Sequence, residues 1–232
     1  SHGQGWTDVN WLIPELAALA PKVDRRMGAN PHANGGRLLV DLDIPDFREY
    51  ALPVPKPATE RHESTRQLGQ MLREIFAKNK AAANFRLFCP DEINSNRLGD
   101  VFTVENRCFV EQAIAIDDHI APDGRVLEVL SEHLCEGWLE GYLLTGRHGL
   151  FATYESFAMV SASMMVQHTK WLEKGINLPW REPVAQLNGL ITPACRRHDN
   201  QGLRQQGPGR ADVQPANGGP QKIAKGTVID KA

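Results

Sequence analysis

The stretch VLEVLSEHLCEGWLEGYLLTGRHGLFATY, residues 126–154, decides the fold that we expect for this chain. Its apolar residues recur at every fourth position, which predicts a helix over residues 126–145 that breaks at Gly146. A short strand over residues 150–154 should follow the break. The predicted core face of this helix is formed by Val126, Leu130, Leu134 and Trp138.

A second stripe on the same predicted helix is acidic and also has a spacing of four: Glu128, Glu132, Glu136 and Glu140. Like charges at this spacing repel each other, so either solvent screens them or one glutamate turns into a pocket, where burial would raise its pKa. Glu132 is the candidate for a pocket because it lies beside His133 and precedes a strand that ends in Tyr154. A carboxyl group and an aromatic ring from adjacent elements could hold a flat heteroaromatic ligand.

Composition limits the class of protein. The chain has 232 residues, of which 41% are hydrophobic and 23% charged, and these values are typical of a globular protein with a sizeable core. The formal net charge of -2 gives no basic field, which argues against a nucleic-acid partner. Its four cysteines have neither zinc-ligand nor disulfide-framework spacing, so we expect a reducing compartment and a cytoplasmic location. No apolar run reaches the roughly 18 residues of a membrane span.

The chain divides into three parts by pattern. Residues 1–60 carry a Gly, Pro and Asn cluster and then three closely spaced prolines, which predict an arm that crosses a surface or links domains. Residues 61–195 alternate between helical and strand-like segments. Residues 196–232 are rich in Gln, Gly, Arg and Pro, so we expect an irregular tail, with a weak strand at 226–229.

The order of elements within residues 61–195 predicts the fold class. Apolar spacing predicts helices at 64–79 and from 156 onward, and short apolar runs predict strands at 85–89 and 184–192. Together with the stretch at 126–154, this alternation predicts an α/β domain with a parallel sheet and helices on both faces.

The loop DEINSNRLGD, residues 91–100, directly follows the strand predicted at 85–89. In open α/β sheets, ligands bind outside the carboxyl ends of the strands. Asp91 and Ser95 supply small polar groups there, and Arg97 supplies a planar cation that suits phosphate. An ordinary capped loop remains the alternative.

General catalytic motifs are absent, since the sequence has no GxSxG, GxxxxGK[ST], HExxH or GxGxxG. Longer segments, however, resemble the pyrimidine-binding middle domain of thiamine-diphosphate-dependent phosphoketolases and, more distantly, of transketolases. The resemblance runs over roughly residues 20–192. It is carried by RRMGANPHANGG at 25–36, FRLFCPDEINSNRLGDVF at 85–102, DDHIAPDGRVLEVLSEH at 117–133 and SEHLCEGWLEGYLLTGRHGLFATYESF at 131–157.

The resemblance implies roles for individual residues. Glu132 matches the glutamate that bonds N1′ of the aminopyrimidine ring, where it does general acid/base work, and Tyr154 matches the aromatic residue at that ring. Asp91, Ser95 and Arg97 match a loop that lines the cofactor and phosphate end of the site. The whole enzyme would split xylulose 5-phosphate, and often fructose 6-phosphate, with inorganic phosphate to give acetyl phosphate and an aldose phosphate.

The match departs from the family after residue 195. At the positions of a Gln, His and Asn that touch phosphate and substrate in the family, this chain has His198, Asn200 and Gln201. The domain that binds the diphosphate through Mg has no counterpart here, and in the family a partner subunit of a homo-oligomer supplies it. Two hypotheses therefore stay open: a fragment of a phosphoketolase, or a non-catalytic α/β remnant that acts as an interaction domain.

Overall fold

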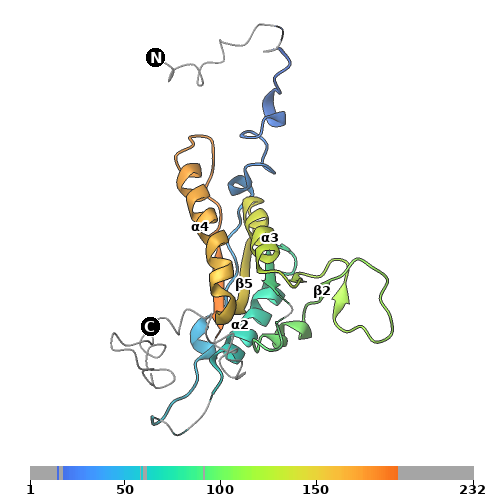
Figure 1. The fold of residues 1–232 in the computed structure, drawn as a ribbon, viewed down its shortest axis with the longest axis vertical. Coiled ribbons are helices and arrows are strands. Elements are labelled where there is room, and N and C mark those ends of the chain that lie inside the picture. Colours follow the sequence, from blue (N-terminus) through green and yellow to red (C-terminus); the bar gives the residue numbers. More distant parts are fainter. Residues whose placement is uncertain (1–14, 16–17, 58, 60–61, 91, 193–232) are drawn as a thin grey trace.

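The computed structural model describes residues 15, 18–57, 59, 62–90 and 92–192. Its centre is a parallel sheet with the strand order β3-β2-β4-β1-β5-β6. The strands are β1 (Phe85–Cys89), β2 (Arg107–Cys108), β3 (Ile120–Ala121), β4 (Val126–Glu128), β5 (His148–Tyr154) and β6 (Asn188–Thr192). Parallel neighbours require crossover connections, and the helices supply these for the longer strands (Figure 1).

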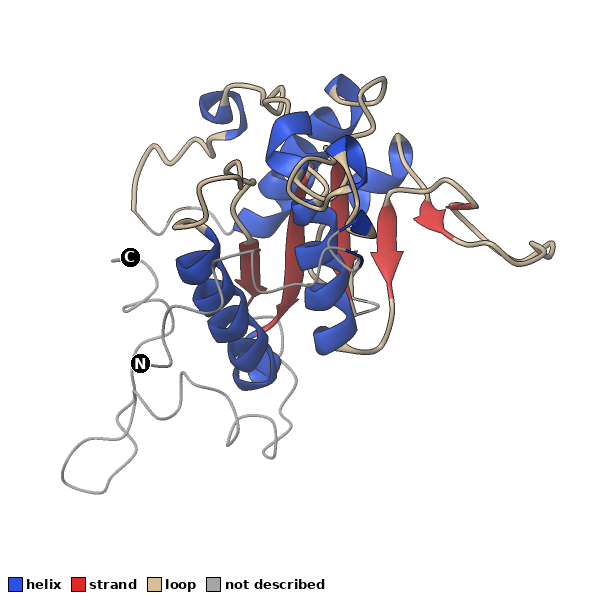
Figure 2. Cartoon of the chain, turned by 90° about the horizontal axis from the view of Figure 1, so that it is seen from above, coloured by secondary structure: helices blue, strands red, loops and turns tan. Residues whose placement is uncertain are grey.

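Three helices cover the two faces of the sheet: α2 (Ser64–Lys78), α3 (Glu132–Leu144) and α4 (Ala158–Gly175). Side chains of a strand alternate between faces, so Leu87 of β1 packs in the cluster under α2, while Phe88 packs under α3. Figure 2 shows helices on both sides of the row of strands. The predicted α/β fold with a parallel sheet covered on both faces is thus confirmed.

Short 3-10 turns complete the described elements. They are Val23–Arg25, Gly35–Leu38, Phe47–Tyr50, Gly99–Thr103 and Glu155–Phe157. The helix predicted over 64–79 and the strand predicted over 85–89 agree with α2 and β1. β6 is shorter than the predicted strand because it begins only at Asn188, where pairing with β5 starts.

The single helix predicted over residues 126–145 is wrong. Residues 126–128 form β4, which pairs with β1, and α3 begins only at Glu132, after the N-cap Ser131. The predicted core face is also wrong, because Leu130, Leu134 and Trp138 are 82%, 48% and 43% exposed. Residues 126–128 belong to a strand and residues 129–131 to the connection that follows it. The buried face of α3 consists instead of Cys135, Glu136, Leu139 and Leu143.

The alternative that solvent screens the acidic stripe also fails for Glu128, Glu136 and Glu140. Glu136 is only 1% exposed. The side chain of Glu128 is mostly buried at the end of β4, where it pairs with Arg107. Glu140 lies against α4, with its Oε1 3.6 Å from Nδ1 of His168. The acidic stripe therefore points mostly inward.

The segment before α2 lies along the domain in part. Asn34, which is buried, donates to the backbone oxygen of Trp180 at 2.6 Å and accepts from the backbone nitrogen of Glu182 at 3.0 Å. Farther along, the backbone nitrogen of Asp43 donates to Asn79 at 3.0 Å. The boundaries 1–60, 61–195 and 196–232 remain predictions. The tail and the strand predicted at 226–229 lie outside the described residues.

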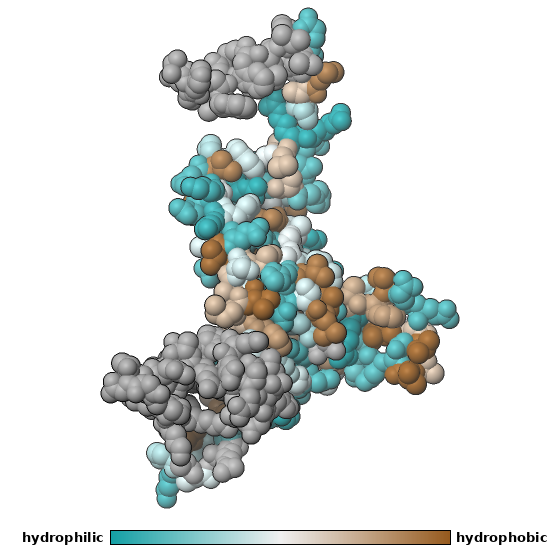
Figure 3. All heavy atoms as spheres, viewed as in Figure 1, coloured by the Kyte–Doolittle hydropathy of each residue, from teal (hydrophilic) through white to brown (hydrophobic). Residues whose placement is uncertain are grey.

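A loop between β2 and β3 projects from the body of the domain (Figure 1). Several of its apolar side chains are exposed, and Figure 3 shows brown spheres gathered on it. They are Phe109, Val110, Ile114 and Ile116. Among the described helices, none is long and apolar enough to cross a membrane.

Candidate binding site at the carboxyl edge of the sheet

Glu132 lies in the first turn of α3, immediately beyond the carboxyl end of β4. The local sequence sets this position, because the hydroxyl of Ser131 accepts a hydrogen bond from the backbone nitrogen of Leu134 at 3.2 Å. The partial positive charge of a helix N-terminus favours a carboxylate in the first turn. Glu132 is partly exposed and lies at the edge of the sheet where ligands bind in open α/β folds.

Tyr154 ends β5 at the same edge of the sheet. Its hydroxyl donates to the hydroxyl oxygen of Ser95, which belongs to the loop after β1. Its ring stacks on Phe157, with centroids 6.4 Å apart and an interplanar angle of 26°. The structure therefore brings together Tyr154 and Ser95, two residues that the sequence predicted for one site. Glu132 comes after β4 and Tyr154 ends β5, and these two strands flank β1.

The loop over residues 92–98 is tied to several strand ends. Asn96 is buried, and its side-chain oxygen accepts from the hydroxyl of Thr192, the last residue of β6. The backbone nitrogen of Ile93 donates to Glu128, the last residue of β4, at 3.4 Å. These bonds anchor the loop to strands on both sides of β1, so it has a fixed place at the carboxyl edge.

Arg97, predicted as an anion contact, lies in this loop and has a φ of 64°. Its Nε donates to both carboxylate oxygens of Glu63 at 3.1 Å. A guanidinium group has five N–H donors, and these bonds use the one on Nε. The side chain is 39% exposed, so donors on its two other nitrogens can meet an anion from solvent.

Glu128 is a residue of this edge that sequence reasoning missed. Its carboxylate accepts from Arg107, whose guanidinium carbon lies 3.8 Å from the ring centroid of Phe102. The signal that could have found it is the Ser131 N-cap. A helix start at Glu132 removes Glu128 from the helical stripe and places it at a strand end.

Glu136 is the second residue that sequence reasoning did not single out. It is buried against the sheet side of α3, and neither carboxyl oxygen has a hydrogen-bond partner in the described part of the chain. Burial, and after it the negative charge of Glu132, raises the pKa of Glu136 to about 7. The raised pKa expected for a glutamate turned inward is thus found one turn after Glu132.

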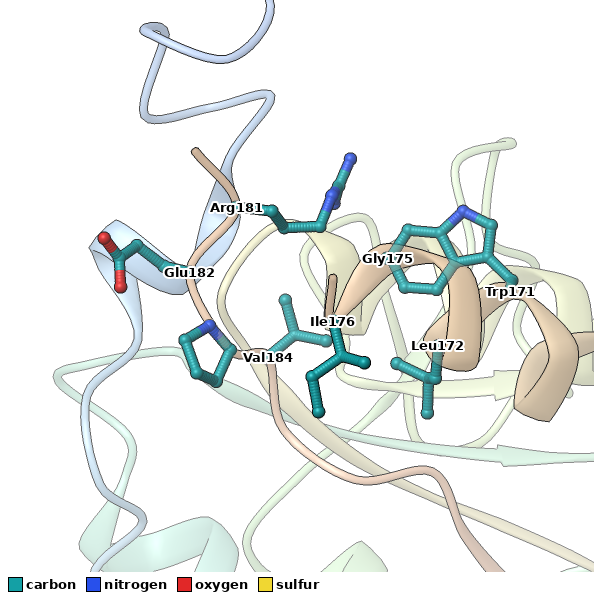
Figure 4. Close-up of a pocket in the computed structure, with 8 residues that line it drawn as sticks. Trp171, Leu172, Gly175, Ile176, Arg181, Glu182 and Val184 are labelled. Carbon is teal, nitrogen blue, oxygen red and sulfur yellow. The ribbon is translucent and has the colours of Figure 1, made fainter. Parts of the chain in front are cut away.

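Four predicted site residues lie outside the described residues: Asp91, His198, Asn200 and Gln201. A pocket of about 220 Å³ lies elsewhere, between the end of α4 and the segment 181–184 (Figure 4). There, Arg181 lies over the ring of Trp171, 4.8 Å from its centroid. Because α4 runs back toward the amino ends of the strands, this pocket is distant from Glu132. The described residues contain no group of three or more His, Cys, Asp or Glu side chains arranged for a metal ion.

The fold and this edge define an α/β domain of the kind that binds ligands at the carboxyl ends of parallel strands. Comparison with known families is more specific. Residues 66–216 match the model of the D-xylulose 5-phosphate/D-fructose 6-phosphate phosphoketolase family. This match spans more than half of the chain, and the chain belongs to the phosphoketolase family.

Individual relatives agree with this assignment. The chain is 56% identical over 202 residues to a probable phosphoketolase of Nitrosospira multiformis, a match that covers 87% of this chain and 25% of the relative. It is 54% identical over 210 residues to a probable phosphoketolase of Mycobacterium avium, with 90% and 26% covered. The chain therefore spans about a quarter of the length of these relatives.

Among solved structures, a transketolase mutant from Pichia stipitis in complex with xylulose 5-phosphate is similar in part. The TM-score is 0.37 and the sequence identity 20%, over 66% of this chain and 19% of that one. A likeness of this size carries no argument about function. The fold class rests on the strand order and the helices described above.

Proposed function

We propose that this chain forms the pyrimidine-binding wall of a thiamine diphosphate site in a phosphoketolase. The observation that carries the proposal is the position of Glu132, in the first turn of α3 at the carboxyl edge of the sheet. Tyr154 ends a strand at the same edge, and the anchored loop 92–98 lies between the two. Phosphoketolase family membership supports the choice of cofactor.

The chemistry of the donor set fits an aminopyrimidine ring. Thiamine diphosphate, when bound, supplies a thiazolium carbon that is deprotonated to a nucleophilic ylide. The carboxyl of Glu132 would share a proton with N1′ of the aminopyrimidine, which is general acid/base work. The ring of Tyr154 would offer an apolar surface to the pyrimidine. Its hydroxyl is already bonded to Ser95, and this bond fixes the orientation of the ring.

The phosphate end of the site would use the loop after β1. Arg97 is held by Glu63 through Nε, so a phosphate oxygen would contact the other two nitrogens of the guanidinium group. Ser95 would line the same end of the site, with its hydroxyl held by donation to the backbone oxygen of Glu92 at 3.2 Å and by the bond from Tyr154. We extend the site to Asp91, His198, Asn200 and Gln201 only on the family pattern, since these residues lie outside the described part.

A second wall must complete such a site, and we assign it to a diphosphate-binding domain of a partner subunit in a homo-oligomer. That domain would also hold Mg. Exposed apolar side chains near Glu132 in the sequence support this assignment, because contact with solvent is unfavourable for Leu130, Leu134 and Trp138.

The complete enzyme would be a lyase of carbohydrate metabolism that cleaves xylulose 5-phosphate with inorganic phosphate to acetyl phosphate and an aldose phosphate. Fructose 6-phosphate would be a second substrate. The other candidate function is a non-catalytic interaction domain that uses the same apolar surface as a partner site. The burial of Glu136 on α3 favours the first candidate, because a buried carboxyl group with a perturbed pKa is typical of a functional site.

Calorimetric titration of thiamine diphosphate into the chain tests the proposal. The chain alone should bind weakly, and addition of a diphosphate-binding domain from a relative should tighten binding. Glu132→Ala should weaken binding by about tenfold or more, the loss of one hydrogen bond to a charged group. Glu140→Ala, a change on the same helix away from the edge, is the matched control. Tight binding to the chain alone that Glu132→Ala leaves unchanged would reject the proposal.

A further inference from the structure

Glu136 is a buried carboxyl group without a visible counter-charge. It is 1% exposed, and neither oxygen has a hydrogen-bond partner among the described residues. A carboxylate in such a place loses its hydration and gains nothing in return, so the neutral acid is favoured. Burial first, and then the charge of Glu132, raises the pKa of Glu136 to about 7. No cationic side chain from the described part offsets this effect.

Glu136 lies one turn after Glu132 on α3. Side chains of an α-helix lean toward its N-terminus, so the Glu136 carboxyl lies over the turn that Glu132 begins. On the same turn of α3, burial and then the charges of Glu132 and Glu136 raise the pKa of the Cys135 thiol to about 12. Residues four apart on a helix have Cβ atoms about 5–6 Å apart, within reach of a direct carboxyl–carboxyl hydrogen bond.

The other titratable groups around this part of α3 interact with residues other than Glu136. On α4, His168 faces Glu140 at 3.6 Å. At the end of β5, the hydroxyl of Tyr154 donates to Ser95, and in the loop after β1 Glu92 lies near enough to Cys135 to act on its thiol. Of these groups, Glu132 is the one whose charge helps to raise the pKa of Glu136.

We propose that Glu136 is a positioning residue for Glu132: its protonated carboxyl donates a hydrogen bond to the Glu132 carboxylate. The shared proton removes the repulsion between two acids one turn apart. It also holds one oxygen of Glu132 toward α3 and leaves the other directed out at the carboxyl edge. This inference rests on the proposed function, since it gives Glu132 a fixed orientation toward an aminopyrimidine ring.

Carbon-13 NMR of the 232-residue chain, labelled at the glutamate carboxyl carbons, tests the pair without any cofactor. One carboxyl signal should titrate near pH 7 and should be missing in Glu136→Gln. In Glu132→Gln the midpoint of this signal should fall, because the neighbouring charge is gone, whereas Glu140→Gln should leave it in place. A midpoint that Glu132→Gln does not move would overturn the proposal, since burial alone would then explain it.

Cofactor binding supplies the second readout, with the chain complemented by a diphosphate-binding domain. Glu136→Gln keeps an N–H donor toward Glu132 and should hold thiamine diphosphate affinity within about threefold, whereas Glu136→Leu should weaken it about tenfold. Equal affinity in both variants would overturn the positioning role. The two failures are distinguishable: if the NMR coupling is present but the cofactor does not bind, the proposed function is wrong. If binding depends on Glu132 without coupling, only the positioning role is wrong.

Discussion

The two faces of α3 have opposite relations between polarity and burial. The outer face carries Leu134 and Trp138, which are nearly half exposed, whereas the inner face carries Glu136, which is 1% exposed. An amphipathic helix on the surface of a globular domain normally buries residues such as Leu134 and Trp138 and exposes a residue such as Glu136. Cys135, Leu139 and Leu143 are buried as expected, so the reversal is confined to Glu136 on the inner face and to the apolar pair on the outer face.

Each face of α3 has its own explanation. On the outer face, exposed apolar side chains beside a candidate site are typical of a surface that a further domain or subunit covers. On the inner face, a buried acid one turn from Glu132 costs stability but can hold its neighbour in one orientation. The outer face therefore relates to contact with a further domain or subunit, and the inner face to the orientation of Glu132. Mutations on each face can test these two roles separately.

The largest expected effect concerns the apolar part of the inner face. Leu139 is fully buried against the sheet, so Leu139→Ala should lower the free energy of unfolding by about 2–5 kcal/mol. Leu134→Ala removes the same atoms from the outer face and should cost less than about 1 kcal/mol in the chain alone. Urea unfolding followed by circular dichroism measures both. Equal losses would show that the outer face is packed in solution.

Glu136 should make stability depend on pH in a defined window. Its folded-state pKa of about 7 lies above the ordinary value of 4.5, so the folded chain binds more protons between these values. The free energy of unfolding therefore falls as pH rises from about 4.5 to about 7, by up to about 3 kcal/mol at 1.36 kcal/mol per unit.

Glu136→Gln should remove this dependence, so the difference in unfolding free energy between the two proteins should change across the window and level off above about pH 7. Urea unfolding at several pH values measures it. Glu140→Gln is the control on the same helix. A difference that stays constant between pH 4.5 and 7 would contradict a protonated Glu136.

The smallest effect on the chain itself is expected at the outer face. Trp138→Ala should change the free energy of unfolding of the isolated chain by less than about 1 kcal/mol, because much of the side chain lies in solvent. In a complete enzyme the same change should weaken subunit association, which analytical ultracentrifugation measures. Unaltered association in that setting would remove the outer face from the interface that we propose.

Much of the fold could be predicted from spacing, because α2, β1, β5 and α4 each have clean periodicity and clear boundaries. The stretch 126–131 could not, because a three-residue strand is too short to show a period of two. Its apolar residues happen to continue the spacing of the helix that follows. Pairing of Val126 with Leu87 in the sheet makes residues 126–128 a strand, and the local sequence carries no signal of that pairing.

The candidate site was predictable to a different degree. Glu132 and Tyr154 follow from the family resemblance together with the acidic stripe and the strand end. Glu136 could not be found this way, because four glutamates at equal spacing look alike until the rotation of the helix is known. The rotation depends on where α3 begins, and Ser131 as N-cap fixes that start. The predicted start at 126, six residues before Glu132, counted Val126 and Leu130 as helix positions and so placed the core face on Leu134 and Trp138.

The most direct test of the central claim, that Glu132 is the pyrimidine-binding glutamate of a phosphoketolase, is a transplant. Residues 62–192 would replace the matching segment in the probable phosphoketolase of Nitrosospira multiformis, and acetyl phosphate release from xylulose 5-phosphate and phosphate would be measured. We predict activity within about tenfold of the relative, and a loss of about 10²–10⁴ in the Glu132→Gln transplant. A folded, active transplant whose rate is unchanged by Glu132→Gln would contradict the role that we assign to Glu132.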